Sequence, residues 1–155
     1  DCIIETDFEM LIPEDYVTNI SERLSLYSRL DNFSSEEELE SFTKELQDRF
    51  GNIPGSVFTL TEMVRVRWLA EKLGMEKLTI KNGILKGQFM DPENEAFYKS
   101  DTFGKILSFI KNNSGKCQLK DAGKRPLLII NGANGDEETK KILQDILQIS
   151  QHNTQ

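Results

Sequence analysis

The period of the hydrophobic residues changes at Gly74, and this change restricts the folds open to the chain. Before Gly74, apolar residues recur every three or four positions, a spacing typical of amphipathic helices. After it, short apolar runs flank Asn82-Gly83, a dipeptide typical of a two-residue hairpin turn. Helices and strands therefore occupy different parts of the chain, without regular strand–helix alternation. The sequence predicts an α+β fold, in which an N-terminal edge strand and a three-helix segment pack with two β-hairpins and two further helices.

The first two helices are predicted on either side of residue 33. One covers residues 17–31, as indicated by apolar residues at helical spacing from just before its start: Tyr16, Ile20, Leu24, Tyr27 and Leu30. The other starts at a capping box made by Ser34 and Glu37 and ends at Gly51, which suits a left-handed cap. Its predicted buried stripe consists of Leu39, Phe42, Leu46 and Phe50.

The third helix is predicted over residues 55–73, directly after Pro54. Its apolar residues lie on two sides of the helix, and a helix that is apolar on two sides is buried on two sides. We therefore expect this helix to be the hub of the domain, with Trp68 largely buried.

The other predicted elements are shorter. They are an edge strand over residues 2–10, a hairpin around Asn82-Gly83, a polar loop over residues 91–100 with one helical turn, a helix over Thr102–Asn112, a second hairpin with its turn at residues 122–124, and a helix over 137–149 capped by Asp136. Residues 1–150 are predicted to form a single domain and residues 151–155 a frayed tail.

The charge of the chain is unevenly distributed along the sequence. The net charge is −7; residues 1–74 hold 16 acidic and 7 basic residues, whereas residues 75–155 hold 10 acidic and 12 basic residues. The acidic half repels a phosphate backbone, which argues against direct nucleic-acid binding and allows a basic protein partner. No apolar run approaches the length of a membrane span, so a cytoplasmic location is expected.

The residues of common catalytic and metal sites are mostly missing from the sequence. The single histidine, His152, lies in the predicted tail, which leaves nucleophilic catalysis without a base. Cys2 and Cys117 form no CxxC pair, so the sequence contains no zinc motif; a disulfide stays possible, although two reduced thiols are the preferred interpretation. We expect neither catalysis nor a cofactor or metal in this chain.

Two short segments have some of the features of a ligand site. "GANGDEE" (132–138) places two glycines before a helix, but it lacks the Lys-Ser/Thr of a phosphate loop and its acidic residues repel phosphate. "DPENE" (91–95) carries three carboxylates that are not at calcium-loop spacing, so a solvated loop is preferred. A small hydrolase would require a pocket that gathers Asp91, Glu93 and Glu95, and this alternative is the least favoured.

The acidic side of the second helix is the strongest candidate for a functional surface. Residues Glu38, Ser41, Glu45 and Asp48 fall on a stripe away from the predicted core stripe. A solvated face is the simpler interpretation, because Glu45 can pair with Arg49 and Lys44 with Asp48 at i,i+4 spacing. Composition alone favours that interpretation.

Four segments in succession carry a family resemblance: "IPEDYV", "RLSLYSRL", "ELQDRFGNIP" and "RVRWLAEKLGM". In this order and spacing they resemble the C-terminal domain of the bacterial transcription-repair coupling factor, Mfd, over residues 11–80. The resemblance implies a fragment of a large ATP-driven translocase that displaces stalled RNA polymerase from DNA and recruits the repair protein UvrA. ATP and magnesium would then be bound by motor modules outside this chain.

The resemblance also implies a regulatory role for the fragment. In the family, this domain docks on a UvrB-like module of the same chain, masks the UvrA-binding surface and restrains the motor. Acidic residues of the helix that carries "ELQDRFG" meet arginines of that module; here they are Glu45 and Asp48, with Arg49 as a possible third contact. The expected fragment is a monomeric, non-catalytic, autoinhibitory interaction domain. The alternative is an adaptor that recruits a separate protein through the same acidic helix.

Overall fold

The computed structural model describes residues 1–122 and 125–150, and within them the chain forms two compact units. Unit 1 combines Asp1–Asp7 with Val66–Gln155, and unit 2 is Phe8–Arg65. Residues 123–124 of the second predicted turn and the predicted tail with His152 lie outside the described residues. The prediction of one domain over residues 1–150 stays a prediction.

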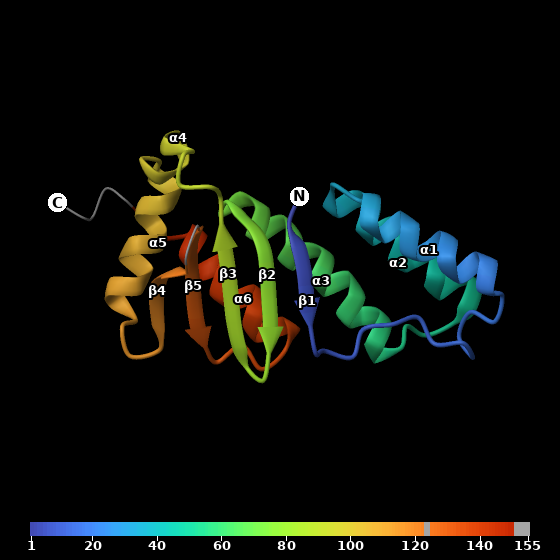
Figure 1. The fold of residues 1–155 in the computed structure, drawn as a ribbon. Coiled ribbons are helices and arrows are strands. Elements are labelled where there is room, and N and C mark those ends of the chain that lie inside the picture. The colour runs from blue at the N-terminus through green and yellow to red at the C-terminus, as the bar shows by residue number, and fades with distance from the viewer. Residues whose placement is uncertain (123–124, 151–155) are drawn as a thin grey trace. The chain divides into compact units, whose positions relative to one another are not determined.

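Unit 2 is helical. It contains α1 (Ile20–Asn32), α2 (Glu36–Phe50) and the first part of α3 (Gly55–Lys72), which continues into unit 1 (Figure 1). Helix α1 buries Leu26 and Leu30, whereas Ile20 and Leu24 are exposed. The apolar spacing therefore located the helix, but two of its apolar residues lie on the solvent side. The side chain of Asn19 caps α1 by accepting from the backbone N–H of Glu22.

Unit 1 is built around a five-stranded sheet in the order β1-β2-β3-β5-β4. The strands are β1 (Ile3–Thr6), β2 (Met75–Lys81), β3 (Ile84–Phe89), β4 (Cys117–Ala122) and β5 (Arg125–Asn131), and the helices that follow α3 are α4 (Glu95–Tyr98), α5 (Asp101–Asn112) and α6 (Asp136–Leu147). All neighbouring strands are antiparallel except β1 and β2, which are parallel. The predicted α+β class, the N-terminal edge strand and the two hairpins are confirmed.

The β2–β3 hairpin turn is the one that the sequence predicts. Asn82 and Gly83 both have positive φ, 55° and 74°, as a two-residue turn that matches the strand twist requires. The turn is held by Asp7, whose carboxylate accepts from the N–H of Asn82 at 2.9 Å. The N–H groups of Gly132 and Ala133 both donate to the carbonyl of Gly83.

One side of the sheet forms the core of unit 1. Side chains of alternate residues on β2, β3 and β5 are fully buried there: Leu78, Ile80, Leu85, Phe89, Leu128 and Ile130. Figure 1 shows α6 behind the strands on this side, and α6 buries Ile142, Leu143 and Ile146. Among the described elements of unit 1, no helix lies over β2 and β3 on the opposite side of the sheet (Figure 1).

Two local predictions differ from the structure. The N-cap of α6 is Gly135, without a side-chain hydrogen bond, and Asp136 is instead the first helical residue. A carboxylate in the first turn interacts favourably with the helix dipole without capping it. Strand β1 covers only Ile3–Thr6, because pairing with β2 ends there. Trp68, which was predicted to be largely buried, has intermediate exposure, which is common for its large ring.

Candidate protein-interaction surface on helix α2

The N-terminus of α2 is fixed by a capping box one residue later than the sequence predicts. The N-cap is Ser35, whose hydroxyl accepts from the N–H of Glu38, instead of Ser34 with Glu37. In return, the carboxylate of Glu38 accepts from the backbone N–H of Ser34 at 3.0 Å and from both serine hydroxyls. These hydrogen bonds, the one from the Ser34 N–H first, lower the pKa of Glu38. Glu38 is therefore part of the helix cap and not of a free acidic stripe.

The buried side of α2 is the predicted one over most of its length. Leu39, Phe42 and Leu46 are fully buried, and Phe50 is partly exposed beside Tyr16, with ring centroids 5.7 Å apart. The hydroxyl of Tyr16 lies 3.2 Å from the carbonyl oxygen of Leu46 and 2.9 Å from that of Gly51, so it donates to the C-terminal carbonyl groups of the helix. Both ends of α2 are thus fixed by side chains.

Glu45 lies at the centre of an ion-pair cluster between α1 and α2. Its two carboxylate oxygens accept from the two terminal nitrogens of Arg29, each at 3.0 Å, in a bidentate pair. Arg49, one turn along α2, donates to the same carboxylate at 3.2 Å, which confirms the predicted i,i+4 pair. The pKa of Glu45 is lowered, first by the hydrogen bond from Arg29. The Glu45 side chain keeps 35% of its surface exposed, so the pair is only partly screened by solvent.

Arg49 extends this cluster back to α1. Its other terminal nitrogen pairs with the carboxylate of Glu22, and its guanidinium lies 4.7 Å from the centroid of the Phe50 ring. The hydrogen bond to Glu22 is the main reason that the pKa of Arg49 is raised. The cluster Glu22–Arg49–Glu45–Arg29 therefore joins the two helices, a contact that the sequence analysis missed because it considered pairs within one helix only.

Asp48 differs from Glu45 in its surroundings. It is exposed, and within the described residues it makes no ion pair; the predicted pair with Lys44 is not formed. Glu37 and Glu40 lie on the same outer side of α2 and are exposed as well. Of the three predicted interaction residues, Glu45 and Arg49 are thus engaged with each other and with α1, whereas Asp48 presents an unpaired carboxylate to solvent.

The other sequence features give no competing site in the described part of the chain. Cys2 and Cys117 are both buried free thiols, and burial raises the pKa of Cys2 to about 11. No group of three or more histidine, cysteine or acidic side chains with metal-site geometry occurs among the described residues. Phe97, Tyr98 and Phe103 stack edge to face in a cluster, so they contribute to packing. Across the described ranges, helices fall short of the length and apolar character needed to cross a bilayer.

The fold is shared with a solved structure. The crystal structure of the C-terminal domain of transcription-repair coupling factor superposes with a TM-score of 0.74, at 16% sequence identity, over 98% of this chain and 95% of that one. At this identity the likeness defines the class of fold. The α+β architecture described above is therefore that of a C-terminal domain of this kind.

Sequence comparisons define the family. The TRCF domain model matches residues 6–100. The transcription-repair-coupling factor of Rickettsia conorii is 34% identical over 124 residues, which are 78% of this chain and 10% of that protein. The Escherichia coli K12 factor is 38% identical over 85 residues, 54% of this chain and 7% of that protein. The chain belongs to the TRCF domain family, as its resemblance predicted, and spans about a tenth of the length of these curated relatives.

Proposed function

We propose that this chain is a non-catalytic, autoinhibitory docking domain of a transcription-repair coupling factor. It docks through the outer side of α2 on the UvrB-like module of the same protein, masks the UvrA-binding surface and restrains the ATP-driven motor. DNA repair coupled to transcription is the process that the family membership supports. Contacts with UvrA, RNA polymerase and DNA are then indirect, through the rest of the longer protein.

The observation that carries this proposal is the unpaired carboxylate of Asp48 on a helix that is held rigidly in place. Both ends of α2 are capped by side chains, and the Glu22–Arg49–Glu45–Arg29 cluster fixes it against α1. Asp48 therefore presents its charge in a defined position, which lowers the entropy lost on binding a basic partner. An exposed charged contact also suits a domain that must be released, because such contacts are weaker than a dry apolar interface.

This geometry separates the roles of the two acidic residues. Asp48 is available to a partner, whereas Glu45 is already bound by two arginines of its own unit. We infer that Glu45 and Arg49 position the helix and that Asp48 makes the intermolecular ion pair. Reversing the charge of Glu45 and Asp48 together would not separate the two roles, because the change at Glu45 affects stability and the change at Asp48 affects docking.

The test is a charge reversal at Asp48 alone in the longer protein. We expect Asp48→Lys to raise both the capture of UvrA and the ATPase rate, because lysine repels the basic module that the aspartate attracts. Asp31→Lys is the matched control: Asp31 is exposed on α1, makes no ion pair within the described residues, and undergoes the same change in charge. Circular dichroism of both variants checks the fold.

Two outcomes contradict the proposal. If UvrA capture and ATPase rate stay at the wild-type level in Asp48→Lys, the outer side of α2 is a solvated face. If Asp48→Lys abolishes binding of a separate protein while UvrA capture and ATPase rate are unchanged, the chain is an adaptor.

A further inference from the structure

The uncovered side of the sheet in unit 1 is a second surface of unusual composition for this chain. The strand register places alternate residues of all five strands on it, opposite the buried side chains of the core. Four of these residues are aliphatic: Ile3, Ile84, Leu127 and Ile129. Ile3 is 63% exposed, and the other three are partly exposed. Ile84, Leu127 and Ile129 form a short aliphatic strip across β3 and β5, whereas Lys77 and Gln88 separate Ile3 from Leu127. Within unit 1, no helix covers this face over β2 and β3.

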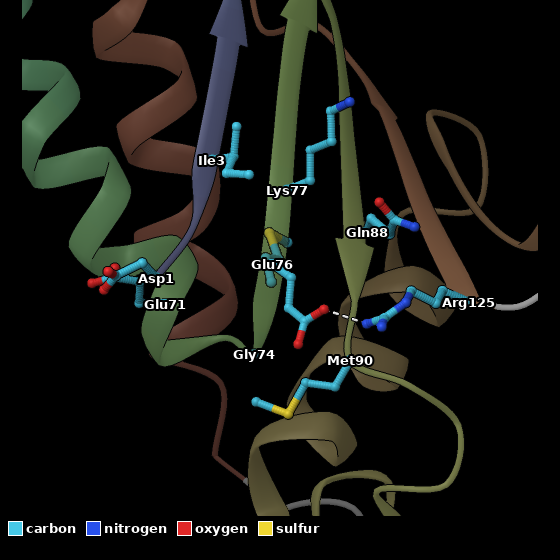
Figure 2. Close-up of a pocket in the computed structure, with 10 residues that line it drawn as sticks. Asp1, Ile3, Glu71, Gly74, Glu76, Lys77, Gln88, Met90 and Arg125 are labelled. Atoms are coloured by element: carbon cyan, nitrogen blue, oxygen red, sulfur yellow. Dashed lines mark hydrogen bonds and ion pairs between the residues drawn. The ribbon is translucent and has the colours of Figure 1, made fainter.

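Cations surround this strip. The register and ion pairs place five of them on the uncovered face: Lys77, Lys81, Lys86, Lys120 and Arg125. Two carboxylates pair with them: Glu5 lies 3.7 Å from Lys77, and Glu76 pairs with Arg125 (Figure 2). Two further acidic residues, Asp1 and Glu71, line the larger groove at the β1 edge of the face. Lys86 makes no ion pair among the described residues. The part of the face on β3, β5 and β4 is therefore basic, although the whole chain has a net charge of −7.

Two adjoining grooves hollow this face. A groove of about 260 Å³ is lined by Lys77, Thr79, Lys86, Gln88, Arg125 and Leu127. The neighbouring groove, of about 500 Å³, shares Lys77, Gln88 and Arg125 with it and continues past Ile3 (Figure 2). Figure 2 shows Lys77, Gln88 and Arg125 rising from the same side of three adjacent strands. The smaller groove combines three cations and two hydrogen-bonding side chains with an aliphatic wall.

We propose that the uncovered sheet face centred on Lys77, Lys86, Arg125 and Leu127 docks an acidic protein segment that also carries aliphatic side chains. Charge complementarity selects the acidic partner, because the smaller groove is lined by three cations and by no carboxylate. The aliphatic strip selects a partner with apolar side chains, since an interface combines an apolar centre with a polar rim. Lysine stems next to Leu127 supply both contacts at once.

A nucleic acid fits this face less well than a protein segment. Single-stranded nucleic acids are held by aromatic side chains on which bases stack, and the described part of this face contains no aromatic residue. A long phosphate backbone also interacts with the net negative charge of the whole chain. A short acidic segment contacts the basic face alone.

This proposal is independent of the docking function of α2. The sheet face belongs to unit 1, and Asp48 belongs to unit 2, so either proposal can fail without the other. Variants on one surface leave the residues of the other unchanged.

The probe is a fluorescein-labelled 16-residue peptide of glutamate, leucine and alanine, with a glutamine-for-glutamate peptide as its neutral counterpart. Fluorescence anisotropy is measured on the 155-residue chain at about 0.1 M salt, where the Debye length is still about 10 Å. We expect the acidic peptide to bind and Lys77→Glu/Lys86→Glu to weaken this binding about tenfold, because attraction is replaced by repulsion. In amide NMR spectra, the residues perturbed by the peptide are expected on β2, β3 and β5.

The matched control is Lys99→Glu/Lys111→Glu, which changes the net charge equally at exposed residues of other elements. It is expected to keep the affinity to within about twofold, because the screened charges are remote from the groove. The proposal is overturned if the acidic peptide does not bind, if the neutral peptide binds equally well, or if both double variants weaken binding alike. Tighter binding of a labelled 16-nucleotide single strand than of the acidic peptide would also overturn it, in favour of a nucleic-acid surface.

Discussion

At the scale of single residues, the chemistry of α2 depends on the partner that each side chain already has. Glu38, Glu45 and Asp48 are all acidic and lie within three turns of one helix, yet Glu38 caps the helix, Glu45 binds arginines and Asp48 faces solvent. Sequence position alone did not distinguish them. The distinction comes from α1 and from the serines that precede α2, and it decides which residue is available for docking.

Neutralising Glu45 should cost more stability than neutralising Asp48. Glu45→Gln leaves Arg29 and Arg49 without their shared carboxylate, and we expect the free energy of unfolding to fall by about 1 kcal/mol for this partly exposed cluster. Asp48→Asn removes no contact and should stay within about 0.5 kcal/mol of the wild type. Urea unfolding of both variants measures the difference. Equal losses would show that the cluster contributes nothing to stability.

The same carboxylate should make unfolding dependent on pH in the acidic range. The folded-state pKa of Glu45 is lowered, chiefly by the hydrogen bond from Arg29, so its stabilisation is fully present above the unfolded-state pKa of about 4.3. That stabilisation is lost as the pH falls through the lower folded-state pKa. We therefore expect the difference in stability between wild type and Glu45→Gln to shrink between pH 5 and pH 3. A difference that stays constant over this range would contradict the assignment.

At the scale of elements, Gly74 marks the junction where the helical part of the chain gives way to strands. It ends the α3 region with a φ of 78°, and an added Cβ would lie 2.2 Å from a ring carbon of Phe97. Phe97 in turn packs against Phe89 and Phe103. The short helix α4 is thus packed over the junction. The segment 91–100, which the sequence indicates to be a polar loop, therefore contributes Phe97 to the core of unit 1.

Gly74→Ala should therefore be strongly destabilising. The positive φ costs about 1–2 kcal/mol for a residue with a Cβ, and overpacking against Phe97 adds about 1–3 kcal/mol. We expect a total loss of about 3 kcal/mol in urea unfolding. In a Phe97→Ala background the clash is removed and only the backbone cost remains, so Gly74→Ala should then cost about 1–2 kcal/mol. An equal cost in both backgrounds would mean that the ring of Phe97 moves aside freely.

Elements defined by local signals were predictable from the sequence, and those defined by distant partners were not. The Asn82-Gly83 turn and the buried stripe of α2 follow from residue types and spacing. The parallel pairing of β1 with β2 does not, because Ile3 and its partner Lys77 are separated by the whole of unit 2. For the same reason, the ion pair between Arg29 and Glu45 was not predicted. The exposure of Ile20 and Leu24 was not predicted either, because the spacing of apolar residues does not show which of them lack a packing partner.

At the scale of the whole molecule, charge is divided between the two units. Residues Phe8–Arg65 hold 12 acidic and 5 basic residues, whereas the rest of the chain holds 14 of each. Unit 2 therefore carries the whole net charge of the chain, and unit 1 carries the basic sheet face. Two surfaces of opposite sign on one chain suit partners of opposite charge, and each of these contacts should respond to salt.

Salt should release the docking contact that we propose for α2 in the longer protein. Exposed ion pairs weaken as the Debye length falls from about 10 Å at 0.1 M to about 3 Å at 1 M salt. With wild-type protein, we expect raised salt to increase the capture of UvrA relative to a truncated form without this domain. Salt weakens the docking contact of the wild type, whereas the truncated form has no docking contact to lose. Asp48→Lys should show little further increase, since its docking contact is already lost at low salt. Pull-down with UvrA over a series of salt concentrations measures this ratio, and the truncated form corrects for the effect of salt on the UvrA contact itself. A parallel response of wild type and Asp48→Lys would mean that the charge of Asp48 does not hold the domain in its docked position.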